Sequence, residues 1–213
     1  MVPRGRLEVA EPEAARVPEL APPLPRAFYA RDAVTVARDL LGCVLVGDLG
    51  DGRVSGRIVE VEAYGGERDP ASHARPGRTA RNASMYGPPG HAYVYFTYGM
   101  HHCANVVVEA EGNASAVLVR ALEPRTGLHR MLRRRQTTDP RRLVNGPGNV
   151  AEAFGLDRTH DGADLTRGPL WISSVRPIVS GERIVASRRI GIRQAVERPW
   201  RFTLETRQER GGR

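Results

Sequence analysis

The sequence predicts a mixed α/β (α+β) fold: a single domain with a curved, largely antiparallel β-sheet, surrounded by helices and carrying a protruding β-hairpin. The predicted elements neither alternate as βαβ units nor consist of strands alone, which favours this class. Short turns containing Gly join neighbouring strands, as antiparallel pairing allows. The 213 residues, of which 40% are apolar, are sufficient for one hydrophobic core.

The chain is predicted to divide into a folded domain over residues 26–207 and two tails. Six of the 16 prolines lie in residues 1–25, mixed with Ala, Glu and Arg and with little apolar periodicity. This composition is typical of a disordered, mobile N-terminal tail. Residues 208–213 are expected to form a short C-terminal tail.

Local patterns predict the elements of the first half. Apolar residues at helical spacing, with Asp32 near the start and Gly42 at the end, indicate a helix over 31–41. Strands over 43–46 and 54–64 follow, joined by a hairpin turn at Asp51 and Gly52. Residues 65–90 are rich in Gly, Pro, Ser and Asn without a periodic run. They predict a long loop, and loops of this length are usually functional.

The second half is predicted by the same signals. Apolar runs indicate strands, Gly112 and Asn113 form a turn, and Pro124 and Pro147 stand at expected helix starts. In chain order we expect strands over 92–98, 103–108 and 116–121, helices over 122–135 and from 146, and strands over 170–173, 183–186 and 200–205.

The charge of the chain indicates an acidic partner. All 32 basic residues are arginine, against 24 acids, which gives a net charge of +8 and a pI near 10.4. A GC-rich coding bias explains the replacement of lysine but not the surplus of positive charge. Arginine binds phosphate through its planar fork, so nucleic acid is the expected partner. Without lysine, a side-chain Schiff base of the kind used by lyases is excluded.

Other classes of protein are disfavoured by composition. No stretch approaches the roughly 20 apolar residues of a membrane helix, and no secretory signal precedes the domain. We therefore expect an intracellular protein located with the DNA, in the bacterial cytoplasm or nucleoid, and acting as a monomer. Cys43 and Cys103 are too few for a disulfide framework and are predicted to be buried thiols. The histidine spacings predict no metal triad.

The strand over 57–64 carries the first candidate chemistry. Alternation places Glu60, Glu62 and Tyr64 on one face, which a solvated outer face would also explain. The strand runs into the long loop, which contributes His73 and several arginines. A carboxylate beside a histidine and phosphate-binding groups is a plausible place for an activated water.

A tyrosine-rich strand supplies the second group of candidate functional residues. Residues 93–98 contain four of the twelve aromatic side chains, with Tyr93 and Tyr95 on one face. This platform is typical of a buried core as well as of base stacking. Asn105 and Arg120 are lone polar residues on neighbouring apolar strands, where each needs a partner or a function. The arginines over 130–142 form either a solvated helix face or phosphate contacts.

Several ordered motifs together resemble the alkyladenine (3-methyladenine, or methylpurine) DNA glycosylase family. The motifs occur in the family's order from about residue 28 to residue 205. They are Arg-Ile-Val-Glu-Val-Glu-Ala-Tyr over 57–64, Ala-Ser-His over 71–73, Tyr-Val-Tyr-Phe-Thr-Tyr-Gly-Met over 93–100, Arg-Ala-Leu-Glu-Pro over 120–124, Asn-Gly-Pro over 145–147, Arg-Ile-Gly-Ile over 189–192 and Pro-Trp-Arg-Phe over 199–202.

The resemblance implies a single-domain enzyme that flips alkylated or deaminated purines out of duplex DNA and hydrolyses the N-glycosidic bond. It implies that Glu62 is the general base that activates water and that Arg120 helps to hold this water. The carbonyl of Ile192 is the other support of the water. Tyr64 and Tyr95 are implied as opposite walls of the base pocket.

Further roles are implied for three residues. His73 would contact the flipped base, Asn105 would crowd the amino group of normal guanine, and Tyr98 would fill the gap left in the DNA helix. Tyr93 and Phe96 are expected to be support. The loop around Pro76 and Gly77 departs from the mammalian pattern, which bears on the lesion range more than on the reaction.

The implied substrate is duplex DNA with a damaged purine: 3-methyladenine, with 7-methylguanine, hypoxanthine and ethenoadenine as further candidates. An alkylated purine is cationic, so tyrosine walls would favour it through cation–π attraction. Neither a metal nor an organic cofactor is expected. Two alternatives remain: a non-catalytic nucleic-acid-binding module, and a carbohydrate hydrolase that uses Glu60 and Glu62, whose backbone positions are roughly 6.5 to 7 Å apart on a strand.

Overall fold

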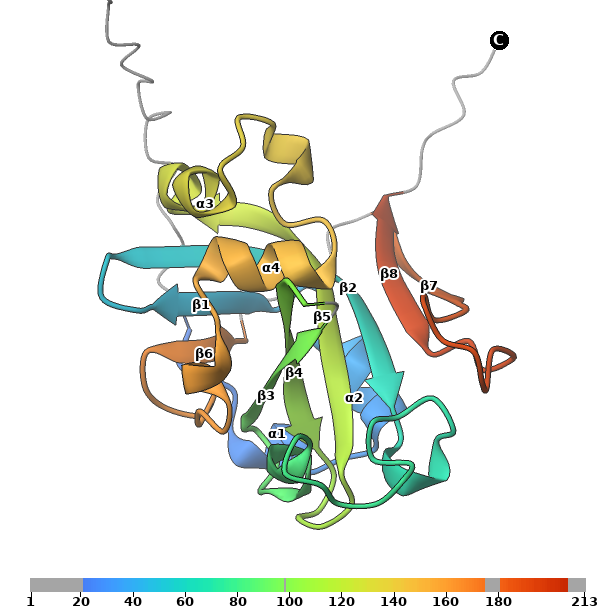
Figure 1. The fold of residues 1–213 in the computed structure, drawn as a ribbon. Helices are drawn as coiled ribbons and strands as arrows, with labels where there is room; N and C mark the ends of the chain where they lie inside the picture. Colours follow the sequence, from blue (N-terminus) through green and yellow to red (C-terminus); the bar gives the residue numbers. More distant parts are fainter. Residues whose placement is uncertain (1–20, 98, 175–180, 207–213) are drawn as a thin grey trace, which may run out of the picture.

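The computed structural model describes residues 21–97, 99–174 and 181–206 (Figure 1). Its helices are α1 (Arg26–Tyr29), α2 (Ala33–Leu40), α3 (Leu128–Arg135) and α4 (Pro147–Phe154). Its strands are β1 (Val44–Asp48), β2 (Arg53–Tyr64), β3 (Ala92–Thr97), β4 (His101–Val108), β5 (Ser115–Thr126), β6 (Leu170–Ser173), β7 (Glu182–Ser187) and β8 (Arg201–Thr206). Short 3₁₀ turns are η1 (Gly66–Arg68), η2 (Ala83–Tyr86), η3 (Pro140–Arg142) and η4 (Arg158–His160).

The described strands form one eight-stranded sheet in which every pair of neighbours is antiparallel. The main path runs β3-β4-β5-β2-β1-β6, and β8 pairs with both β2 and β7. In Figure 1, α4 lies in front of β4 and β5, and α2 packs against β2 and β5 from behind. The mixed α/β class with a curved antiparallel sheet is confirmed.

Strand β2 changes partner half-way, and this change curves the sheet. Its first half pairs with β1, from Arg53 to Arg57, and its second half pairs with β8, from Glu60 to Glu62. Register shifts against β5 lie between Ile58 and Val61. A β-bulge of this kind bends a strand and increases its twist. The bend carries the last residues of β2 away from β1 and toward β8.

The two longer inner helices bury the faces that their sequences predict. Helix α2 begins after Asp32, whose side chain accepts a hydrogen bond from the Thr35 amide, and it buries Val36 and Leu40. Helix α4 begins with Pro147 at its first turn and buries Phe154. Both helices thus lie where the sequence predicts them, because capping residues and apolar spacing agree locally.

The predicted helix over 122–135 is wrong over its first six residues. Strand β5 continues through Pro124, opposite Gly56, and the helix begins at Leu128. Pro124 is tolerated in the strand because β4 pairs only with the first residues of β5, so the other side of Pro124 needs no amide donor. The strand ends at Thr126, and the next residue, Gly127, has a φ of 73°.

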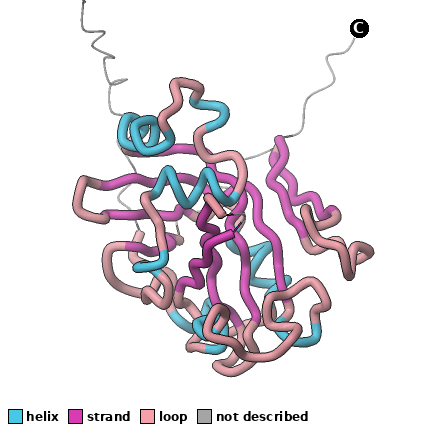
Figure 2. The backbone as a smooth tube through the Cα atoms, in the orientation of Figure 1, coloured by secondary structure: helices cyan, strands magenta, loops and turns pink. Residues whose placement is uncertain are grey.

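The long loop over 65–90 is confirmed, and it contains the turns η1 and η2 (Figure 2). Asn82 holds it together by donating to the carbonyls of His73 and Gly77 and accepting from the Thr79 amide. At the N-terminal side, Leu24 is buried and its amide donates to the Ile172 carbonyl. Ordered contacts therefore begin before the predicted boundary at residue 26, because Leu24 fills part of the core.

None of the helices within the described ranges is long and apolar enough to cross a membrane. Cys43 and Cys103 are both buried, as predicted.

We predict that Gly127→Ala lowers the free energy of unfolding by about 2 to 4 kcal/mol, measured by urea denaturation. A Cβ at this position would lie 2.5 Å from the Arg53 carbonyl oxygen and would stand on a backbone with positive φ. Gly112→Ala is the control, because φ is 94° there and nothing lies within 4 Å of the added Cβ. Equal losses in the two variants would contradict the close approach at Gly127.

Candidate active site

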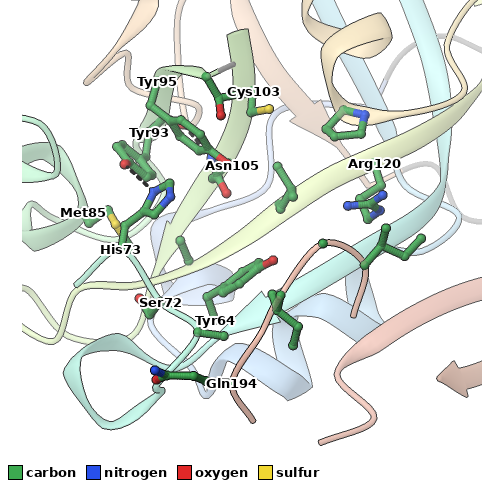
Figure 3. Close-up of a pocket in the computed structure, with 18 of the residues that line it drawn as sticks. Tyr64, Ser72, His73, Met85, Tyr93, Tyr95, Cys103, Asn105, Arg120 and Gln194 are labelled. Atoms are coloured by element: carbon green, nitrogen blue, oxygen red, sulfur yellow. Dashed lines mark hydrogen bonds between the residues drawn. The ribbon is translucent and has the colours of Figure 1, made fainter. Parts of the chain in front are cut away.

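A cavity of about 380 Å³ opens where β2, β3, β4 and β5 meet the loop over 65–90, the start of α4 and the segment after β7. Its size is within the range of small-molecule pockets. Seven residues that the sequence singles out line it, and Figure 3 shows how most of them point inward. They are Tyr64, His73, Tyr93, Tyr95, Asn105, Arg120 and Ile192.

Aromatic rings form one side of the cavity. Tyr95 stacks on Tyr93 with ring centroids 5.1 Å apart, and the His73 ring meets Tyr95 edge-on at 4.5 Å. His73 Nδ1 lies 3.0 Å from the Tyr93 hydroxyl (Figure 3). Tyr93 is buried as support, as predicted, whereas Phe96 is exposed at the hairpin edge. Strand alternation explains why the two tyrosines share a face.

The titratable groups of this wall are neutral at pH 7. Burial raises the pKa of Tyr93 to about 12 and raises the pKa values of Tyr64 and Tyr95 further. Desolvation lowers the pKa of His73, although the residue is exposed, and the charge of Arg81 adds to this effect. The wall therefore offers hydroxyl groups and a neutral imidazole.

Asn105 is placed by β4 at the floor of the cavity. Its side-chain amide donates to the Tyr93 carbonyl at 3.0 Å, across the β3–β4 pair. A buried amide needs such a partner, and the bond fixes the orientation of the side chain. The sequence indicates that Asn105 needs a partner, and the backbone carbonyl of Tyr93 in β3 is that partner.

The two carboxylates of β2 meet Arg120 of β5. Arg120 Nε donates to Glu60 Oε1 at 3.0 Å, and Arg120 Nη1 lies 3.3 Å from Glu62 Oε2. Arg201 of β8 also donates to Glu60 Oε1, at 2.6 Å. Glu60 and Glu62 thus lie on the same side of the strand, as alternation predicts, with Arg120 between them.

Glu62 is fully buried and is held by two hydrogen bonds and one ion pair. The Tyr64 hydroxyl donates to Oε2 at 2.8 Å, and the Ile190 amide donates to Oε1 at 2.7 Å. Arg120 forms the ion pair. Among the described residues, Tyr64, Arg120 and Ile190 line the cavity but Glu62 does not. The carboxylate therefore lies one side chain behind the cavity surface, and Oε1 keeps an acceptor position for a further donor.

A buried ion pair anchors the segment after β7. Arg189 and Asp69 are both fully enclosed and are joined by two hydrogen bonds, and Arg189 also donates to the Ala63 carbonyl at 2.9 Å. Burial alone would raise the pKa of Asp69, but the bonds and charge of Arg189 outweigh it and lower the pKa. The Arg189 guanidinium also lies 4.7 Å from the centre of the Tyr64 ring.

Sequence reasoning did not identify Asp69 or Arg189 as part of the site. The two residues are 120 positions apart, and nothing local to either one indicates the other. Tyr98, the predicted intercalating residue, lies outside the described residues.

Part of the predicted basic stretch is used inside the protein. Arg134 pairs with Asp51, and Arg135 pairs with Glu152, so these two side chains tie α3 to the β1–β2 turn and to α4. Their charges are therefore partly compensated. Within the described residues, no group of three His, Cys, Asp or Glu side chains is close enough to hold a metal ion.

Comparison with known proteins identifies the family. The family model described as methylpurine-DNA glycosylase matches residues 27–208. The chain belongs to this family. The resemblance inferred from the ordered motifs is thereby confirmed.

Relatives of this glycosylase-family protein are similar over most of their length. A protein of Methanoculleus marisnigri is 51% identical over 184 residues, which cover 85% of this chain and 95% of the relative. A protein of Carboxydothermus hydrogenoformans is 49% identical with the same coverage, and one of Rhodopseudomonas palustris strain HaA2 is 50% identical over 87% of this chain and 89% of the relative. Each carries the name "Putative 3-methyladenine DNA glycosylase".

We predict that Arg189→Met and Asp69→Leu each lower the free energy of unfolding of this glycosylase-family protein by about 3 to 5 kcal/mol, because each leaves a buried charge without its partner. The double variant is expected to recover much of the loss. Urea denaturation measures all three.

The matched control is Arg183→Met, which breaks an ion pair with Glu205 between exposed side chains. Its expected effect is about 0.5 kcal/mol or less. Additive losses in the double variant would show that Arg189 and Asp69 do not act as a pair.

Proposed function

We propose that this chain is a base-excision-repair DNA glycosylase that flips a damaged purine out of duplex DNA and hydrolyses its N-glycosidic bond. The purine is 3-methyladenine or another alkylated or deaminated purine. The observation that carries the proposal is a buried carboxylate, Glu62, held by Tyr64, Arg120 and the Ile190 amide beside an aromatic cavity.

The cavity supports binding of a flipped base. Tyr64 and Tyr95 line it from different strands, and His73 and Asn105 contribute polar edges. Stacking on aromatic side chains is worth about 1 to 3 kcal/mol per base. Flipping costs a few kcal/mol and less at a damaged pair. Because the two quantities are comparable, a modest effect of the lesion decides which bases stay in the pocket.

The chemistry needs one carboxylate and one water. The water oxygen forms a bond to C1′ of the sugar, the N-glycosidic bond breaks, and its electron pair leaves with the base. The water proton passes to Glu62, which we place as the general base at Oε1, beside the Ile190 amide. Arg120 and the Ile192 carbonyl are the proposed supports of this water. Tyr98 remains the proposed residue that fills the gap in the DNA.

The partner is then duplex DNA, bound by a monomer and without a cofactor. A non-catalytic binding module would bind undamaged single strands and release no base. The carbohydrate hydrolase is disfavoured, because Glu60, the second carboxylate that it would need, is engaged by Arg120 and Arg201. A two-carboxylate mechanism needs both groups at the sugar.

We predict that Glu62→Gln lowers the single-turnover rate of 3-methyladenine release by about 10²- to 10⁴-fold, the usual contribution of a general base. Binding to lesion-containing duplex is expected to change little, because the cavity walls remain. Glu111→Gln, at an exposed carboxylate, is the control and should be fully active. A Glu62→Gln variant with the wild-type rate would remove Glu62 from the mechanism.

We also predict that the product is an intact abasic site. Cleavage of the strand through a side-chain Schiff base needs a lysine, and the chain contains none. A 5′-labelled duplex should therefore stay full-length after base release and break only on treatment with alkali. Strand breaks that are present before alkali treatment would contradict this prediction.

A further inference from the structure

An arginine guanidinium lies close to the ring of each of the two wall tyrosines, Tyr64 and Tyr95. The Arg189 guanidinium carbon lies 4.7 Å from the centre of the Tyr64 ring, and that of Arg81 lies 5.6 Å from the centre of the Tyr95 ring. The two tyrosines line the cavity, whereas the two arginines do not. Each guanidinium therefore lies against the ring of a wall tyrosine without lining the cavity itself.

The two arginines differ in their charge balance. Arg189 is paired with Asp69, so its charge is compensated at close range. Arg81 is exposed and donates from Nη2 to the Phe96 carbonyl at 3.2 Å. Among the described residues, no carboxylate oxygen lies within ion-pair distance of Arg81. A carbonyl dipole does not cancel a full charge, so the wall at Tyr95 has an uncompensated cation beside it.

The charge of Arg81 reaches the cavity. It acts with desolvation to lower the pKa of His73, whose ring meets Tyr95 edge-on. It also acts on the Tyr93 hydroxyl, which faces His73, in the direction that lowers its pKa. A positively charged ligand stacked on Tyr95 would feel the same field.

We propose that Arg81 is a specificity-determining residue, which lowers the preference of the pocket for cationic purines and so brings neutral deaminated or etheno purines within its substrate range. The inference rests on the proposed glycosylase function. A tyrosine face attracts a cation through the negative charge of its π system. Here a guanidinium already lies at the Tyr95 ring, and it repels a second cation that approaches the same ring.

The size of the effect follows from Coulomb's law. Two unit charges separated by about 9 Å, with an effective dielectric constant between that of a protein surface and that of water, give a discrimination of about threefold to tenfold. The effect should be larger at low ionic strength, because Arg81 is exposed and is screened by salt.

An exposed arginine can also serve simply as a phosphate contact. The position of the Arg81 guanidinium favours the wall role, since the Phe96 carbonyl and the Tyr95 ring together hold it against the hairpin. A phosphate contact would weaken binding of every duplex to a similar degree and would reduce the salt dependence. The two roles therefore give different results in one experiment.

The experiment compares duplexes with one 7-methylguanine, which is cationic, or one hypoxanthine, which is neutral. Single-turnover rates and dissociation constants are measured for wild type, Arg81→Gln and Arg81→Lys at low and moderate salt. Arg81→Gln should raise the ratio of 7-methylguanine to hypoxanthine excision by about threefold to tenfold. Arg81→Lys keeps the charge and should stay near the wild-type ratio.

Arg78→Gln is the matched control. Arg78 lies in the same loop, is exposed, and stands 5.6 Å from the ring of Tyr86, which does not line the cavity. The ratio of 7-methylguanine to hypoxanthine excision in Arg78→Gln should equal that of wild type. An equal loss on both lesions in Arg81→Gln, with a weaker salt dependence, would identify a phosphate contact and overturn the proposal. An equal change in Arg81→Gln and Arg81→Lys would show that charge is not the cause.

A second readout does not depend on catalysis. NMR titration of His73 in the free protein should show a higher pKa in Arg81→Gln than in wild type, and an unchanged value in Arg81→Lys. An unmoved His73 pKa in Arg81→Gln would show that the charge does not reach the cavity, and it would overturn the inference. A wild type that releases neither of these bases nor 3-methyladenine overturns the proposed function itself. A wild type that releases only 3-methyladenine, or an active wild type with an unchanged Arg81→Gln ratio, overturns the inference alone.

Discussion

The ion pair between Arg189 and Asp69 is the constraint on which the rest of the site depends. A buried pair of this kind contributes little net stability compared with an apolar replacement, because desolvation of the two charges offsets their attraction. The main effect of this ion pair is to fix the positions of the segments that it joins. It joins the start of the loop over 65–90 to the segment after β7. Arg189 also donates a hydrogen bond to the carbonyl of Ala63, near the end of β2. Because Ile190 follows Arg189 directly, its amide is brought to Glu62.

The bend in β2 supplies the other half of the arrangement. A straight strand would pair with β1 along its whole length, and its last residues would stay in that part of the sheet. The bulge releases the second half of β2 to β8, which brings Arg201 to Glu60. Strand β5 stays beside β2 throughout and brings Arg120 between the two carboxylates. The site is therefore a product of strand pairing and not of the loops alone.

The sequence predicts the features that depend on local interactions and misses those that depend on contacts between distant residues. Alternation along one strand is local, so it correctly places Glu62 with Tyr64 and Tyr93 with Tyr95. The helix over 122–135 is predicted too early, because the pairing of Pro124 with β2 overrides the local helix signal. The pairing of Asp69 with Arg189 spans 120 residues and leaves no local pattern. The motifs indicate the family, but the layer that covers Glu62 is visible only in three dimensions.

In the proposed reaction one carboxylate serves a transition state that develops positive charge on the sugar, and the charges around Glu62 affect that role. Arg120 is close enough to Glu62 to cancel much of its negative charge, which would weaken its effect on such a transition state. Glu60 reduces this cancellation, because its own negative charge offsets part of the positive charge of Arg120. It accepts hydrogen bonds from both Arg120 and Arg201. Two carboxylates and two guanidinium groups then sum to zero, and Arg120 is shared between Glu60 and Glu62. In the proposed complex the local field at the sugar therefore depends on Glu60 as well, although Glu60 does not line the cavity.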